Sequence, residues 1–488
     1  MNMNRVFLVL VYIFVALALI IKFYSTNLRL VKNGQSVQYV DYSSSIYHPV
    51  MIPTMLAAIG ILMPMMGIFT LFDYVYGILF PMFIELSLYY AILICCAPLV
   101  KRKLSAKACA ALWILPNMMY VAYVQPNFRV QPDVVISLNH HWAIVLMIVW
   151  GLGFFVTMGW YILTHLHFRK KILKHSKKVF DDKIFKIWQE EFKESEVKIK
   201  QQDSLLICEN LTTPLTIGLF KGSIRVLLPH KEYTEHQLRL IFRHELVHLK
   251  KDDNLSKFFF AFCNALCWFN PLMWGAMKQC AEDLERSCDA AILMESDQTE
   301  RKVYAELILN SDADQRGFTT CLSSSFESMR YRLKEIMTPV KLHSGIGVLV
   351  AVVLLLSMMT GKTAFAYHSR NLDFSNFGDL VEIRIIEADG ITVDDIVQCK
   401  TDKTVIDKLS ELEVNEISLM YQNSLSHDLC LSMKFEDVSW YSLEIAEIEN
   451  GLLIYEEYRK DKYYRQLYFC EGETIDSILS MLNLETID

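Results

Sequence analysis

Six long apolar runs constrain the fold of this chain more than any other feature of its sequence. They lie near residues 5–22, 50–72, 77–99, 106–124, 142–165 and 344–361. A helix of about 20 apolar residues is long enough to cross the hydrocarbon core of a bilayer. With 53% hydrophobic residues, the 488-residue chain is too apolar for an ordinary soluble protein and long enough for two or three domains. We therefore predict a mainly α-helical fold built on a polytopic membrane helix bundle.

Basic residues predict which side of the membrane each segment faces. Residues 101–103 (KRK) follow the third run, and residues 169–178 hold six Lys or Arg after the fifth. Such loops stay in the cytosol, whereas residues 125–141, before the fifth run, are poor in charge. We therefore predict a multi-pass membrane protein with a cytosolic region after the fifth run. The first run has only Arg5 as a charged start and no prompt cleavage site, so we interpret it as an uncleaved anchor rather than a signal peptide.

The most specific chemical signal is an HExxH sequence at residues 244–248 (HELVH). Thr234 and Gln237 fit a capping box that starts a helix just before it. Two imidazoles four residues apart lie on one helix face and can share a zinc ion. Glu245, between them, can then serve as the general base for a water molecule that the metal activates. Because so short a pattern also arises by chance, a solvated His/Glu helix face is the alternative.

A catalytic zinc needs three protein ligands and an open position. Glu285 and Asp289 are four residues apart and share a helix face, so Glu285 is a candidate third ligand. Asp289 could then accept the free N–H of a zinc histidine and fix its tautomer. Cys288 is a weaker candidate ligand, because a buried neutral thiol is commoner. The donor to the oxyanion stays open among three nearby side chains: His230, His236 and Arg243.

Together these motifs resemble the M56 family of membrane metallopeptidases, the family of the β-lactam sensor-transducers BlaR and MecR. The similar segments cover roughly residues 204–293: Thr213-Pro214 with Gly218, residues 222–229 (GSIRVLLP), residues 244–254 (HELVHLKKDDN), Trp268-Phe269-Asn270-Pro271 with Trp274, and residues 285–289 (ERSCD). The resemblance implies a gluzincin-like site with Zn²⁺ as cofactor. Its residues would be His244, His248 and Glu285 as metal ligands and Glu245 as catalytic base. We predict Asp289 and Asp253 as supporting residues around these ligands.

The resemblance also implies a multi-pass protein of a bacterial cell membrane, with a cytosolic protease that a signal from outside activates, as in an antibiotic response. Its partners would be a protein substrate, either the chain itself or a cytosolic repressor-like regulator, together with membrane lipid and an unknown extracellular ligand. No direct binding to nucleic acid is expected. Two alternatives stay open, namely a non-enzymatic membrane receptor with a structural zinc site and a membrane quality-control protease.

Four further segments of the predicted protease domain have sequence patterns that predict their structure. Residues 166–200 are rich in Lys, Glu and Asp, which favours a solvated connecting helix. Residues 203–209 and 223–228 are predicted strands, either a small structural sheet or an edge that binds substrate by strand addition. The apolar residues 255–277 are too few for two membrane crossings, so we predict a buried or surface-lying helix pair in which Pro271 starts the second helix.

The C-terminal region alternates like a small α+β domain. We predict strands at 381–386 and 429–435, a hairpin at 441–455 around Asn450-Gly451, and helices at 404–412 and 474–484. The region holds no SxxK sequence, so the resemblance does not extend to the penicillin-acylating sensor domain of BlaR and MecR. Among Cys399, Cys430 and Cys470, one pair could form a disulfide.

These observations predict four parts. They are an N-terminal membrane bundle of about five spans (1–165), a cytosolic zinc metalloprotease domain (166–343), a last transmembrane helix (344–366) and a small extracytoplasmic α+β domain (367–488).

Overall fold

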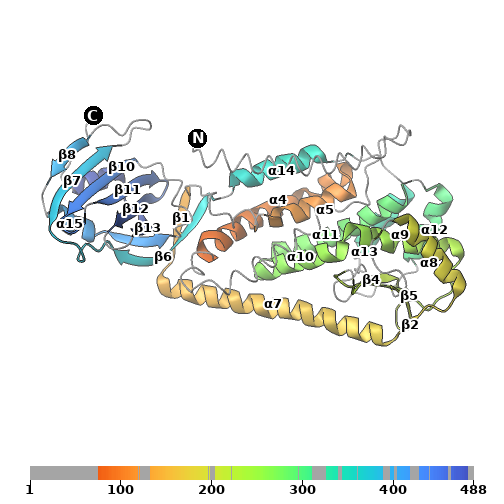
Figure 1. Ribbon diagram of the computed structural model, residues 1–488. Helices are drawn as coiled ribbons and strands as arrows, with labels where there is room; N and C mark the ends of the chain where they lie inside the picture. The colour runs from red at the N-terminus through yellow and green to blue at the C-terminus, as the bar shows by residue number, and fades with distance from the viewer. Residues whose placement is uncertain are drawn as a thin grey trace.

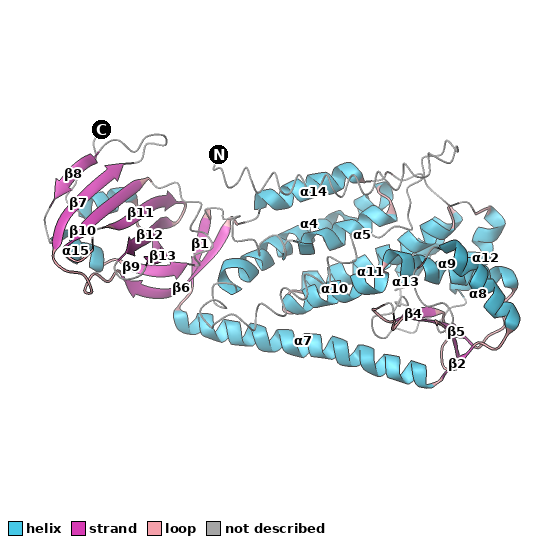
Figure 2. Ribbon diagram, viewed as in Figure 1, coloured by secondary structure: helices cyan, strands magenta, loops and turns pink. Residues whose placement is uncertain are grey.

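The structure is a computed structural model of the chain, and most of it is helical apart from two separate β-sheets (Figures 1 and 2). It describes residues 75–118, 120, 132–195, 197, 204–220, 222–294, 296–309, 326–338, 343, 345–359, 361–387, 396–400, 404–417, 428–438, 440–459 and 463–481. The first two apolar runs, at 5–22 and 50–72, therefore lie outside the described residues.

Two described helices have the length and apolarity to cross a membrane, and they correspond to the third and fifth apolar runs. The first comprises the π-helical turn η1 (Val75–Leu79) and α4 (Phe80–Lys103), and the second is α7 (His140–Lys174). With 35 residues, α7 is about 52 Å long. Most of its apolar side chains are exposed, including Phe155 and Trp160. This helix therefore presents an apolar surface that the rest of the described chain does not cover.

In their described residues, the fourth and sixth apolar runs form helices shorter than a membrane span. Helix α5 (Ala106–Ile114) is followed by the 3-10 turn η2 (Leu115–Met118), because Pro116 cannot donate to a continuing α-helix. All nine residues of α5 are buried, and the helix packs against α11 and α4, so its described part is a core helix and not a lipid-facing span. Helix α14 (Ile346–Met359) has 14 residues and is about 21 Å long, less than the ~30 Å of a bilayer core.

The region between α7 and α14 combines a small sheet with a group of helices. The sheet has the order β2-β3-β5-β4, with β3 and β5 parallel. Its strands and the helices that follow are β2 (Ser176–Lys178), α8 (Asp182–Ser195), β3 (Leu205–Cys208), β4 (Leu215–Ile217), β5 (Arg225–Pro229), α9 (Glu235–Lys251), α10 (Asp253–Leu266), α11 (Pro271–Ile292), α12 (Gln298–Leu309) and α13 (Phe326–Met337). The strands predicted at 203–209 and 223–228 are confirmed as β3 and β5.

Helix α8 corrects the prediction of a solvated connector at 166–200. That segment holds the end of α7, strand β2 and α8. Trp188 on α8 is fully buried, and its ring meets that of Phe242 on α9 at a centroid distance of 5.2 Å. The charged residues hid this contact, because only one stripe of α8 is apolar and it packs against the helix that carries the HExxH sequence.

The helix pair predicted between 255 and 277 is confirmed. The predicted capping box of Thr234 and Gln237 begins α9. The helix ends at Lys251, and the next residue, Asp252, has a left-handed φ of 56° that turns the chain into α10. Pro271 is the first residue of α11, and the Asn270 side chain caps it by accepting from Leu272 N. Most of α10 is buried, and its apolar residues share one hydrophobic core with residues of α4, α5, α7 and α11.

The C-terminal region forms most of a nine-stranded sheet of order β1-β6-β9-β13-β12-β11-β10-β7-β8. Its elements are β1 (Val134–Ser137), β6 (Thr363–Asn371), β7 (Leu380–Glu387), β8 (Ile396–Lys400), α15 (Thr404–Ser410), β9 (Glu413–Ile417), β10 (Leu429–Phe435), β11 (Tyr441–Ile448), β12 (Gly451–Arg459), β13 (Tyr463–Glu471) and α16 (Ile475–Met481). The α+β character, the hairpin β11–β12 and both helices are as predicted. Cys430 and Cys470 are free thiols, so that pair forms no disulfide.

The sheet and the α9–α13 region lie at opposite ends of the long helices (Figure 1). Strand β1, just before α7, pairs in parallel with β6, just after α14, so both segments lie at the sheet end. At the other end, Lys101 near the end of α4 lies 3.2 Å from Asp283 on α11, and Arg169 near the end of α7 donates to Ser223 O (3.4 Å). The basic segments 101–103 and 169–178 therefore lie at the end of the molecule that holds the HExxH helix.

Candidate metal centre

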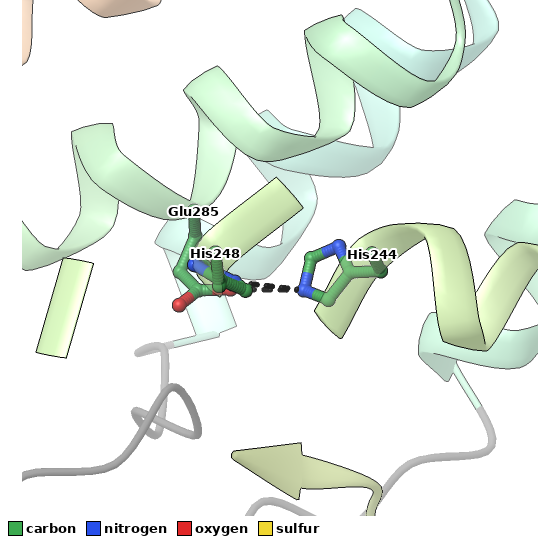
Figure 3. Close-up of side chains that lie close together, drawn as sticks. All are labelled: His244, His248 and Glu285. Carbon is green, nitrogen blue, oxygen red and sulfur yellow. Dashed lines mark hydrogen bonds and ion pairs between the residues drawn. The ribbon is translucent and has the colours of Figure 1, made fainter. Parts of the chain in front are cut away.

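Two helices bring the predicted metal ligands together. His244 and His248 lie on α9, and Glu285 lies on α11 facing them (Figure 3). The two Nε2 atoms are 3.0 Å apart. Glu285 Oε2 lies 3.6 Å from His244 Nε2 and 3.5 Å from His248 Nε2. A circle through these three atoms has a radius of about 2.0 Å, which is the length of a Zn–N or Zn–O bond. The arrangement therefore fits one small divalent cation.

The bond from His248 Nδ1 to Asp253 fixes the tautomer of that imidazole. The distance to Asp253 Oδ2 is 2.7 Å, and both side chains are buried. Although burial opposes ionisation of Asp253, Lys251 and the bond from His248 hold its pKa below the usual range. A carboxylate accepts only, so Nδ1 carries the proton and Nε2 presents its lone pair toward the other ligands.

His244 is oriented by a tyrosine that the sequence did not predict. Its Nδ1 lies 3.7 Å from Asp289 Oδ1, too far for the direct bond predicted from the sequence. Tyr304 Oη, on α12, lies between them, 2.8 Å from Nδ1 and 2.7 Å from Asp289 Oδ1. Burial and the Asp289 carboxylate raise the pKa of Tyr304 well above its usual range, so the hydroxyl donates to Asp289 and accepts from Nδ1–H. The Nε2 lone pair of His244 therefore also faces the centre.

Glu285 is held so that one oxygen faces the histidines. Its Oε1 accepts from Lys257 Nζ at 3.2 Å, which leaves Oε2 toward the two Nε2 atoms. Two imidazole lone pairs and one carboxylate oxygen thus converge, and such a set repels itself unless a cation or a proton lies between its members.

Glu245, the proposed base, is buried on the same helix and bonded to the small sheet. Thr216 Oγ1 on β4 donates to Glu245 Oε2 at 2.7 Å. Asn254 Nδ2 donates to the carbonyls of Thr216 and Gly218, which fixes β4 against the start of α10. Strand β4 is at the edge of its sheet and pairs with β5 on one side only. The edge nearest the HExxH helix therefore belongs to the strand that anchors Glu245.

Cys288 lies beside the centre but on the far side of His248. Its Sγ is 3.2 Å from His248 Nδ1 and 3.3 Å from Asp253 Oδ2. These three residues form a second group of possible ligand atoms, but that group uses Nδ1 and not Nε2. Burial raises the pKa of the Cys288 thiol, so it stays neutral. Cys288 is therefore placed to hydrogen-bond around the ligands and not to complete the set formed by His244, His248 and Glu285.

The three candidate oxyanion donors are engaged elsewhere or exposed. Arg243 Nε donates to Glu191 at 2.8 Å, and His236 lies 3.5 Å from Glu300. His230 is exposed. None of the three has a described contact with the metal ligands, so the structure brings together the predicted ligands and supporting carboxylates but not these donors.

This region of the chain is similar to the M56 peptidase family. Residues 133–336 match the family model described as BlaR1 peptidase M56. The match begins at β1, includes α7 and the small sheet, and ends within α13. The sequence resemblance, which rested on residues 204–293, is thereby confirmed and extended in both directions.

Two regulatory proteins are similar to part of the chain. Regulatory protein BlaR1 of Bacillus licheniformis is 27% identical over 137 residues, which is 28% of this chain and 23% of that protein. Regulatory protein BlaR1 of Staphylococcus aureus is 28% identical over 137 residues, which is 27% of this chain and 23% of that protein. The matched part thus spans about a quarter of the length of these relatives.

Proposed function

We propose that the chain is an integral-membrane zinc endopeptidase that transduces an external signal by cleaving itself or a cytosolic regulator. One observation carries the proposal: the Nε2 atoms of His244 and His248 and the Oε2 atom of Glu285 surround a point about 2.0 Å from each. Both histidines are held with a lone pair toward that point. The M56 family match supports peptidase chemistry at this site.

The residues of the centre divide the work of peptide hydrolysis. A zinc ion held by the three ligands would polarise the scissile carbonyl and activate a water molecule. Glu245 takes a proton from the attacking water at a carboxylate oxygen and passes it to the leaving amine. Thr216 fixes the orientation of that carboxylate. As an edge strand, β4 would align an extended substrate by main-chain pairing if the sheet acts by strand addition and is not purely structural.

The placement of the site supports a cytosolic protease and an extracytoplasmic sheet domain. The basic ends of α4 and α7 lie at the metal end of the molecule, and basic segments next to spans favour the cytosol. Strand β1, from the charge-poor loop, lies in the C-terminal sheet at the other end. A signal bound by the sheet would therefore act at a distance from the site that cuts.

The position of Cys288 counts against the alternative of a receptor with a structural zinc site. A structural zinc is usually enclosed by four protein ligands. In the part of the chain that the structure describes, the residue groups able to hold a metal give the Nε2 side of His248 only three ligands. A zinc ion held by these three ligands would have a fourth position left for water or substrate.

The test compares the wild type with Glu245→Gln in membranes, with and without candidate envelope stresses. The matched control is Glu235→Gln on the same helix, whose exposed side chain forms a surface ion pair with Arg239. We expect inducible fragments in the wild type and control and none in Glu245→Gln, with equal zinc content in all three. Fragments that persist in Glu245→Gln would refute cleavage by this site. Broad cleavage of unrelated proteins without an inducer would favour the quality-control alternative.

A further inference from the structure

Helix α13 brings an arginine from far along the chain into contact with the residues around the metal centre. Arg332 Nη2 donates to Asp289 Oδ1 at 2.8 Å, and Arg332 Nε donates to the other oxygen of the same carboxylate. Nη2 also lies 3.6 Å from Glu285 Oε2. The Arg332 side chain is only 15% exposed, so water screens these contacts weakly. One guanidinium thus faces a metal ligand and the carboxylate that orients another ligand.

A continuous chain of hydrogen bonds joins Arg332 to His244. The fork of Arg332 fixes both oxygens of Asp289, and one of these oxygens accepts from Tyr304. The Tyr304 oxygen in turn accepts from Nδ1 of His244. The Asp289 side chain is only 5% exposed, and a buried carboxylate without a neighbouring cation would destabilise the fold. The charge and orientation of Arg332 therefore determine the position of Asp289, and through it the position of the Tyr304 oxygen that accepts from His244.

Helix α13 is docked by contacts beyond Arg332. Glu335 accepts two bonds from Arg286 on α11, at 2.5 and 2.6 Å. Tyr331 Oη donates to the carbonyl of Lys101 at the end of α4 (3.3 Å). Only eight residues separate the end of α13 from the start of the apolar helix α14. The segment that leads into α14 is therefore held directly on the helix that carries Glu285.

We propose that Arg332 is a positioning residue for the metal centre, and that the centre is complete only while α13 is docked on α11. This deepens the proposed function and rests on it only in that the three ligands hold zinc. Arg332 acts through Asp289 and Tyr304 on His244, and through its charge on Glu285. Displacement of α13 removes both effects at once. Docking of α13, the helix that precedes α14, would thus control the zinc affinity and the geometry of the metal site.

The test measures zinc affinity of the purified full-length chain by competition with a chromophoric chelator. Arg332→Gln is compared with Arg330→Gln, the same change two residues away on an exposed position of α13. We expect Arg332→Gln to lower zinc affinity about 10- to 100-fold, as loss of a partner around a metal ligand does, and Arg330→Gln to leave it unchanged. Equal affinity in wild type and Arg332→Gln would overturn the proposal while leaving the proposed function intact. A wild type that holds no zinc would remove both.

A double-mutant cycle with Tyr304→Phe separates the relay from a general loss of structure. If Arg332 acts through Tyr304, the combined change lowers zinc affinity by less than the product of the two single losses. A full product would show independent effects and overturn the relay. Tyr304→Phe also tests the chain of bonds without altering α13, should Arg332→Gln fold poorly. Wild-type zinc affinity in Tyr304→Phe would refute the relay as well.

Discussion

Asp253→Asn should separate two roles that one carboxylate has in this structure. Asp253 Oδ2 accepts from His248 Nδ1 at 2.7 Å and lies 3.8 Å from Lys251 Nζ. The first contact orients a metal ligand, and the second compensates a cation that is 2% exposed. Asn keeps the shape of the side chain and removes its charge. The change should therefore weaken metal binding and also destabilise the fold, for two different reasons.

The two effects have different expected magnitudes. A hydrogen bond to a charged group contributes about 1.5–3 kcal/mol, and loss of a partner behind a metal ligand lowers metal affinity about 10- to 100-fold. Leaving a buried cation without its partner costs about 3–5 kcal/mol. Lys251 keeps its bond to Ser287 Oγ at 2.8 Å, so we expect the lower end of that range. Lys251→Met in the Asp253→Asn background removes the uncompensated charge and should restore most of the stability.

Zinc affinity and thermal unfolding of the detergent-solubilised full chain measure the two effects separately. Asp253→Asn should lose both, and Asp253→Asn with Lys251→Met should recover stability and not zinc affinity. The matched control is Asp252→Asn at the adjacent residue, because Asn tolerates its left-handed φ of 56°. If the double variant regains wild-type zinc affinity, or if Asp253→Asn never loses it, the bond from His248 to Asp253 does not orient the metal ligand.

Three further substitutions test other parts of the structure. Thr216→Val removes the hydroxyl that bonds the proposed base but suits a strand, so cleavage should slow about 2- to 10-fold at unchanged zinc content; equal rates would contradict the anchoring role. Gly153→Ala would place a Cβ 2.0 Å from the ring of Trp268 and should cost about 1–3 kcal/mol, measured by thermal unfolding. Gly151→Ala on the same helix meets nothing within 4 Å, so it should be neutral or stabilising, and equal effects of the two would refute this packing. Trp188→Ala should destabilise by about 3–5 kcal/mol, whereas a change of about 0.5 kcal/mol or less would return α8 to the role of a solvated connector.

The ligands could be predicted from the sequence because local geometry determines them. Two histidines four residues apart share a helix face in any α-helix, and Glu285 with Asp289 repeats the same spacing on a second helix. The capping box and Pro271 fixed where two of the helices begin. Local helical spacing is thus enough to predict the metal ligands, without knowing how the two helices pack.

The supporting residues could not be predicted, because nothing local marks them. Tyr304 is 60 residues from His244, and Arg332 is 43 residues from Asp289. A tyrosine and an arginine on amphipathic helices are ordinary residues, and only the packing of α12 and α13 beside α9 and α11 gives them their role. The α8 contact was missed for a related reason, since its many charges conceal a narrow apolar stripe that contains Trp188.

The loop between the two ligand-bearing segments is bound to the long helix α7. Trp150 Nε1 donates to the carbonyl of Leu266 (2.8 Å), and Trp268 Nε1 donates to the carbonyl of Trp150 (3.2 Å). Gly153 leaves the space that the Trp268 ring occupies, so α7 and this loop interlock. Because α9 and α11 lie on either side of this loop and α10, a shift of α7 would change their separation. A site that needs three atoms about 2.0 Å from one point tolerates little such change. The contacts of α7 and α13, like those of α4 and α5 with α11, are therefore physical routes by which the long apolar helices can act on the metal centre.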